Sequence, residues 1–169
     1  TEAQRSRDLE QALGRQRTAQ LQVDQSRRQV NQGVQQSLQA LRTENSEVRK
    51  RLGTLQSQTQ LEQRGAKITQ QLSQLSGADA ATRRAATAQV GRYTGALRAT
   101  LSAQQQAASS YRSMAQRARD AASSIQGNSS AAKAARSAHL NLARGFDAAA
   151  GRASAAAGRT AALAAAFVD

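Results

Sequence analysis

His139 is the only histidine in this chain of 169 residues, and imidazole is a common general base and metal ligand. A catalytic histidine needs a nucleophile and an orienting carboxylate, and a metal site needs further ligands. The chain has no cysteine, and Asp147 lies about two helical turns beyond His139. We therefore expect a core or interface histidine. The alternatives are catalysis, or a metal or anion site in which several chains bring His139 together around a symmetry axis.

The carboxylates do not suggest a catalytic pair. There are 11 of them, and they are scattered along the chain. Glu44 and Glu47 lie close together, but basic residues at positions 42 and 49–51 surround them, which indicates ion pairing along a helix. No phosphate-binding loop, nucleophile elbow or metalloprotease motif occurs. The sequence thus predicts a protein that is not an enzyme, without catalytic residues, cofactor, metal or small-molecule substrate.

Arginine dominates the charge. The formal net charge is +13, and only Lys50, Lys67 and Lys133 are lysines. Such an excess favours contact with polyanions, whereas the alternative is that arginine only solvates the outer helix faces. The candidate polyanion contacts are Arg136, Arg144, Arg152 and Arg159. Because stacking aromatics and a concentrated basic region are missing, we expect nonspecific contact with DNA and no sequence-specific reading.

Asn45 interrupts the strongest apolar seam. The seam residues follow at alternating steps of three and four, as in a heptad repeat. A single buried asparagine in such a seam pairs with its symmetry mates and fixes register and oligomer state. We predict that this segment sets the register of a homo-oligomer through Leu38, Leu41, Asn45, Val48, Leu52 and Leu55. The alternative is that Asn45 faces solvent, or that a stutter in the repeat near Val34 turns it outward.

The elements that carry these residues are predicted to be long helices, because proline is absent and alanine, arginine and glutamine favour helix. Residues 1–76 are expected to form one long Gln/Leu-rich coiled-coil helix, running from about Glu2 to Leu75. Gly77 and Asp79 then suit a left-handed cap and an N-cap. Residues 77–169 are expected to form an Ala-rich helical hairpin with helices at about 80–126 and 131–168. Gly127 and a serine at 129 or 130 separate the two.

The two helices of the hairpin carry regular four-three seams. Many of these positions are alanine, so each buries little apolar surface and the helices can approach closely. The larger residues predicted to pack the helices are Leu97, Leu101, Tyr111, Ile125, His139, Leu142, Phe146, Leu163 and Phe167. The predicted fold class is all-α, with long helices in coiled-coil and helical-hairpin packing, elongated and oligomeric.

The proline-free Gln/Ala/Arg/Ser composition, the long heptad helices and the Ala-rich tail from Gly151 to Val168 resemble bacteriophage structural proteins. The nearest types are the internal virion (ejection) proteins and the tape-measure proteins. The resemblance is one of composition, so it assigns no role to an individual residue. Tape-measure proteins are usually longer and carry a hydrophobic membrane-active stretch that this chain lacks.

The resemblance implies a structural component of the virion, with copies of itself and other structural proteins of the same assembly as partners. Two other classes remain open. One is a coiled-coil spacer of the bacterial periplasm or cell envelope, including a spanin-like rod. The other is a scaffold that contacts DNA or another polyanion without sequence preference.

Overall fold

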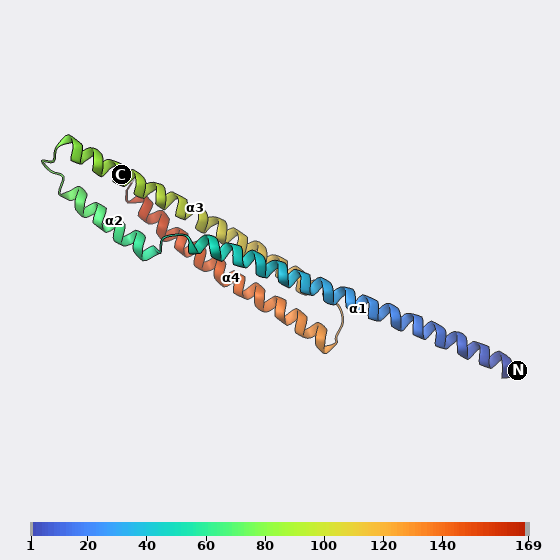
Figure 1. Cartoon of the computed structure of the whole chain (residues 1–169). Coiled ribbons are helices and arrows are strands. Elements are labelled where there is room, and N and C mark those ends of the chain that lie inside the picture. Colours follow the sequence, from blue (N-terminus) through green and yellow to red (C-terminus); the bar gives the residue numbers. More distant parts are fainter. Residues whose placement is uncertain (1, 168–169) are drawn as a thin grey trace.

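The computed structural model describes residues 2–167, which form four α-helices and no strand. The helices are α1 (Glu2–Gly53), α2 (Gln58–Ser73), α3 (Ala80–Ser124) and α4 (Ser130–Ala165), and together they make an elongated molecule (Figure 1). The all-α class predicted from the sequence is confirmed. Residues 1, 168 and 169, at the ends of the predicted segments 1–76 and 77–169, lie outside the described residues.

The single helix expected from Glu2 to Leu75 is wrong, because it is divided into α1 and α2. α1 ends at Gly53, which has a low helix propensity. The Oγ of Ser57 accepts from the backbone N–H of Gln60, and the Gln60 side chain accepts from the N–H of Ser57. This reciprocal capping box satisfies two N–H groups at the start of α2 and so favours a new helix over a continued one.

The predicted caps of the hairpin are confirmed. Asp79 accepts a hydrogen bond of 2.7 Å from the backbone N–H of Thr82, and this bond lowers the pKa of the Asp79 carboxyl. Ser129 caps α4 in the same way, through the N–H of Ala132. Gly77 has a φ of 93°, a left-handed conformation that glycine adopts without a Cβ penalty. The turns before α3 and α4 therefore lie where the sequence places them.

α3 and α4 are antiparallel neighbours along α4, and the first turns of the longer α3 extend beyond the end of α4 (Figure 1). Arg119 pairs with Asp147, and Arg112 donates to Ser154, so the residue number rises on one helix as it falls on the other. The close approach of the two helices depends on buried alanines: Ala107, Ala108, Ala115, Ala118, Ala122, Ala143, Ala150, Ala153 and Ala157. Small side chains allow this contact without a wide core.

α3 is the central helix, because α1, α2 and α4 all pack against it. One core cluster joins Leu41 and Val48 of α1 to the middle of the hairpin, around Met114 and Phe146. A second cluster joins Leu61 and Ile68 of α2 to the start of α3 and the end of α4. The molecule is thus a bundle with three helices in cross-section, in which α1 and α2 follow one another along one side of the hairpin.

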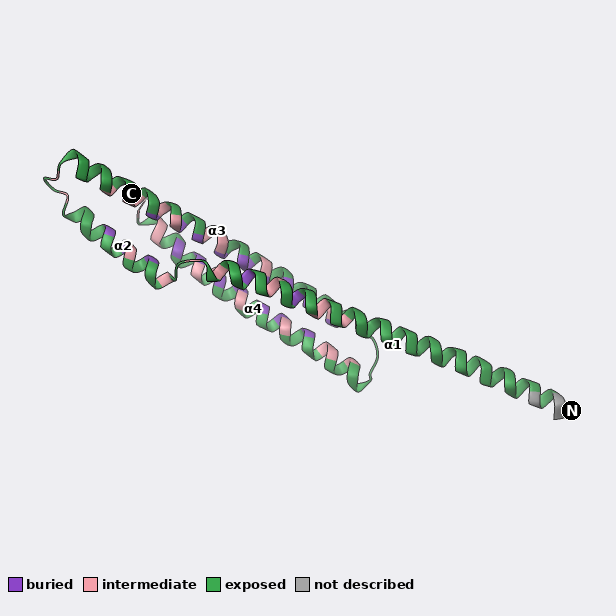
Figure 2. Cartoon of the chain, viewed as in Figure 1, coloured by how far each residue is buried: buried purple, intermediate pink, exposed green. Residues whose placement is uncertain are grey.

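The first part of α1 extends beyond this bundle (Figures 1 and 2). Further along, between residues 19 and 34, α1 borders a pocket at the turn between α3 and α4. Every residue from 4 to 33 whose side chain the structure describes is exposed. We call residues 4–33 the projecting arm. At 1.5 Å per residue the arm is about 45 Å long.

Candidate interaction surfaces

The projecting arm carries an apolar stripe on its surface. Leu9 and Leu21 are each 65 % exposed, and Leu13, Val23 and Val30 are between 43 % and 49 % exposed. Leu9, Leu13, Val23 and Val30 lie on the same heptad seam, which also contains the polar residues Gln16, Gln20 and Arg27, whereas Leu21 lies off it. The stripe therefore has the spacing by which one helix packs along another.

The predicted Asn45 seam divides into two rows within the bundle. Leu41 and Val48 are buried against the α3–α4 hairpin of the same chain. Leu38, Asn45 and Leu52 are half-buried and line an open groove. Leu55, the last seam residue, is half-buried in the turn after α1 and also lines the groove. Asn45 is thus neither fully buried nor turned outward, and its role in oligomer register stays a prediction.

The groove lies between α1 and α4, and residues of α3 form its floor. Its volume is about 990 Å³. Leu38, Asn45 and Leu52 are seven residues apart on the α1 wall, and Leu142, Ala149 and Ala156 are seven residues apart on the α4 wall, so both walls follow a heptad repeat. We call this feature the α1–α4 groove.

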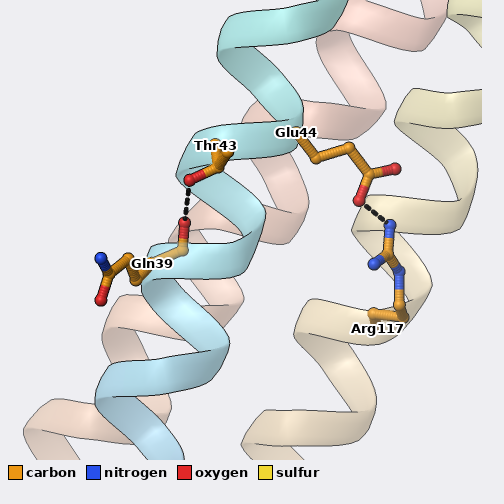
Figure 3. A network of polar contacts seen from close by, with 4 residues as sticks. All are labelled: Gln39, Thr43, Glu44 and Arg117. Atoms are coloured by element: carbon orange, nitrogen blue, oxygen red, sulfur yellow. Dashed lines mark hydrogen bonds and ion pairs between the residues drawn. The ribbon is translucent and has the colours of Figure 1, made fainter.

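An ion pair between Glu44 and Arg117 joins α1 to α3 (Figure 3), and neither residue lines the groove. Next to Glu44, the hydroxyl of Thr43 donates to the carbonyl of Gln39 at 3.0 Å (Figure 3). Both groups of the ion pair remain partly exposed, so its contribution to stability is at most about 1 kcal/mol. Its effect is to orient α1 on α3, and within residues 2–167 no ion pair joins α1 to α4.

The four arginines predicted to contact a polyanion have different surroundings. Arg136 is half-buried and donates to the carbonyls of Ile125 and Gly127, at 3.4 and 3.0 Å, beyond the end of α3. Arg144 and Arg159 are exposed, and Arg152 is exposed at the edge of the α1–α4 groove. Arg136 therefore supports the turn between α3 and α4, which distinguishes it from the other three.

His139 is fully buried in α4. Its Nδ1 donates to the carbonyl of Ala135 at 3.0 Å, which leaves Nε2 buried without a hydrogen-bond partner among the described residues. No group of three or more potential metal ligands is found within residues 2–167. The surroundings of His139 are thus those of a core residue.

The nine larger residues predicted to pack the helices are all buried or half-buried. Buried are Leu97, Tyr111, Ile125, His139 and Phe146, and half-buried are Leu101, Leu142, Leu163 and Phe167. Tyr111 and Phe146 stack with their ring centroids 6.4 Å apart, across the α3–α4 interface. These residues face the hairpin or its edges.

Sequence reasoning missed Tyr93, which is fully buried where α2, α3 and α4 meet. Its hydroxyl donates to the carbonyl of Leu61 at 2.6 Å, and its ring meets Phe167 edge-on at 5.0 Å. Burial raises the pKa of the Tyr93 phenol. The hydroxyl lies directly over Gly65 of α2, where a Cβ would be 2.7 Å from it. The signal in the sequence is that Tyr93 is one of only two tyrosines in the chain and lies in an Ala-rich helix.

A buried polar contact joins the same three helices further along. The hydroxyl of Thr160 in α4 lies 2.9 Å from Oε1 of Gln104 in α3 and 3.2 Å from Oε1 of Gln58 in α2. Thr160 and Gln104 are both buried. Gln104 also borders the α1–α4 groove, so this contact fixes one end of the groove floor.

Among the described residues, no helix is long and apolar enough to cross a membrane. No protein-family model, curated protein or solved structure matches the chain. The exposed stripe of the arm and the α1–α4 groove are therefore the features that bear on function.

Proposed function

We propose that this chain is a non-enzymatic structural component of a helical assembly, in which the projecting arm pairs lengthwise with helices of other copies. The observation that carries the proposal is the exposed heptad stripe of the arm, including Leu9 and Leu13. A helix that stands alone in water is marginally stable, and most helical stability in proteins comes from packing an apolar face. Coiled-coil pairing with other copies supplies that packing.

The exposed area supports the same proposal. The chain exposes 11890 Å², whereas a compact monomer of 17.9 kDa exposes about 8000 Å². The excess is larger than the roughly 1,600 Å² buried in a standard protein–protein interface. An assembly that buries the arm removes part of this excess.

We propose that this assembly belongs to a bacteriophage particle, because the composition resembles that of phage structural proteins. Other structural proteins of the particle are then further partners. A rod of the bacterial periplasm or envelope is the alternative for the same helical assembly. A second candidate function is nonspecific contact with DNA, favoured by the three arginines Arg144, Arg152 and Arg159 that remain exposed along α4. That contact predicts binding that weakens steeply with salt and does not depend on DNA sequence.

The experiment compares oligomeric state in analytical ultracentrifugation. The wild-type chain is expected to self-associate at micromolar concentration, and Leu9→Glu with Leu13→Glu is expected to give monomers, because two carboxylates enter the apolar stripe. Gln4→Glu with Gln11→Glu is the matched control, since it adds the same charge on the opposite face of the arm and is expected to leave association unchanged. A wild-type chain that sediments as a monomer, or a control that dissociates equally, contradicts the proposal.

A further inference from the structure

The α1–α4 groove has the form of a helix-binding site. Both of its walls repeat every seven residues, and its floor continues the pattern with Gln104 and Tyr111 of α3. A surface that repeats every heptad along three parallel or antiparallel helices presents equivalent positions to one further helix, as in a four-helix bundle. A flexible chain or a single small ligand would not require this periodicity.

The charge around the groove has one sign. Arg42 and Arg49 of α1 and Arg152 of α4 line it, and no carboxylate does. None of the three arginines forms an ion pair within residues 2–167. The nearby carboxylates are engaged elsewhere, Glu44 with Arg117 and Glu47 with Lys50. An occupant of the groove therefore meets a partly apolar surface between positive charges that have no ion-pair partner within residues 2–167.

The middle of the groove is polar on one wall. Asn45 lies between Leu38 and Leu52, with an amide that can both donate and accept hydrogen bonds. A polar residue at one seam position specifies the register of a helix packed against it. This gives Asn45 a role toward a partner helix that differs from pairing with its own symmetry mate.

We propose that the α1–α4 groove binds an acidic amphipathic helix of another protein, whose apolar stripe faces the groove and whose carboxylates meet Arg42, Arg49 and Arg152. A second copy of this chain fits the groove less well. Its projecting arm has six arginines and three carboxylates between residues 4 and 33, so it would bring like charges to the groove. The groove is thus a surface for a different partner, separate from the arm.

The test uses the full chain and two synthetic helical peptides of about 21 residues, or three heptads. Both have leucine at the a and d positions; one has glutamate at e and g, and the other lysine. Binding is measured by fluorescence anisotropy at low and at high salt. The glutamate peptide is expected to bind about tenfold more tightly, equivalent to about 1.4 kcal/mol, and the difference is expected to shrink at high salt because screening weakens exposed ion pairs.

Variants locate the binding site. Arg42→Glu with Arg49→Glu is expected to abolish or reverse the preference between the two peptides. Arg83→Glu with Arg84→Glu, which makes the same charge change at the exposed start of α3, is the matched control and is expected to keep the preference. Equal binding of both peptides, binding of neither, or an equal loss in the two variants would overturn the proposal.

Two further measurements separate this proposal from others. Binding of phosphatidylglycerol vesicles through Arg42 and Arg49 without binding of the glutamate peptide would assign the groove to a lipid surface and overturn the helix proposal. The variant with Leu9→Glu and Leu13→Glu is expected to bind the glutamate peptide as the wild type does, because its changes are confined to the arm. Loss of binding there would place the peptide on the arm and also overturn the proposal, whereas self-association through the arm is tested independently.

Discussion

Gly65 gives the sharpest test of how the helices fit together. Glycine inside a helix is usually unfavourable, so replacing it with alanine normally stabilises by about 1 kcal/mol. At Gly65 an added Cβ would lie 2.7 Å from the hydroxyl oxygen of Tyr93 and 3.4 Å from Phe167. The Tyr93 ring cannot yield easily, because its hydroxyl is bonded to Leu61 and its edge is packed against Phe167.

Gly65→Ala is therefore expected to destabilise the protein. Overpacking costs about 1–3 kcal/mol, and weakening the Tyr93 hydrogen bond costs about 0.5–1.5 kcal/mol. After the gain in helix propensity, the net loss is expected to be about 1–3 kcal/mol. Urea unfolding followed by circular dichroism measures the free energy. Tyrosine fluorescence reports on Tyr93 together with Tyr111, because these are the only tyrosines and the chain has no tryptophan.

Gly158→Ala is the matched control, since it lies inside α4 and an added Cβ there meets no atom within 4 Å. It is expected to stabilise by about 0.5–1 kcal/mol. Tyr93→Phe removes the clashing oxygen and is expected to cost less in the Gly65→Ala background than alone. If Gly65→Ala stabilises the protein as much as Gly158→Ala does, the close contact between α2 and α3 is refuted.

Two further predictions concern polar contacts. Thr160→Val keeps the shape of the side chain but leaves the buried Gln104 amide without its partner, so a loss of about 1–3 kcal/mol is expected in urea unfolding. The exposed Thr87→Val is the control, and equal effects of the two changes would contradict the buried contact. Ser57→Ala removes the cap of α2 and is expected to cost about 1 kcal/mol and to speed amide exchange in the first turn of α2. Unchanged exchange there would show that the cap does not hold the break between α1 and α2.

The sequence predicts the hairpin well because its signals are local. Asp79 and Ser129 can cap a helix wherever it packs, and Gly77 and Gly127 suit left-handed turns. The break between α1 and α2 was also encoded locally. Ser57 and Gln60 form a capping box, and the heptad spacing slips at the same place, because Leu61 follows Leu55 by six residues instead of seven. The apolar periodicity resumes beyond the break, and it is this continuation that predicts a single helix.

The sequence does not show which seam residues pack within the chain and which line its surface. Leu41 and Asn45 belong to one heptad pattern, yet Leu41 is buried against α3 and Asn45 lines the groove. Periodicity identifies an apolar face, whereas the partner of that face depends on how the whole chain folds back. Tyr93 was missed for the same reason. α3 lies between other helices and so buries a wider face than a single seam.

Helix lengths explain why the projecting arm exists. α1 and α2 hold 52 and 16 residues, which reach about 100 Å at 1.5 Å per residue. α3 holds 45 residues and α4 36, so the hairpin is no longer than about 68 Å. The hairpin cannot cover the whole of α1 and α2, whatever the side chains at the interface. Because α2 is held at the far end of the hairpin by Tyr93, the uncovered length must lie at the start of α1. The exposure of the arm is therefore a consequence of unequal helix lengths, and the proposed pairing with a helix of another copy would bury its stripe.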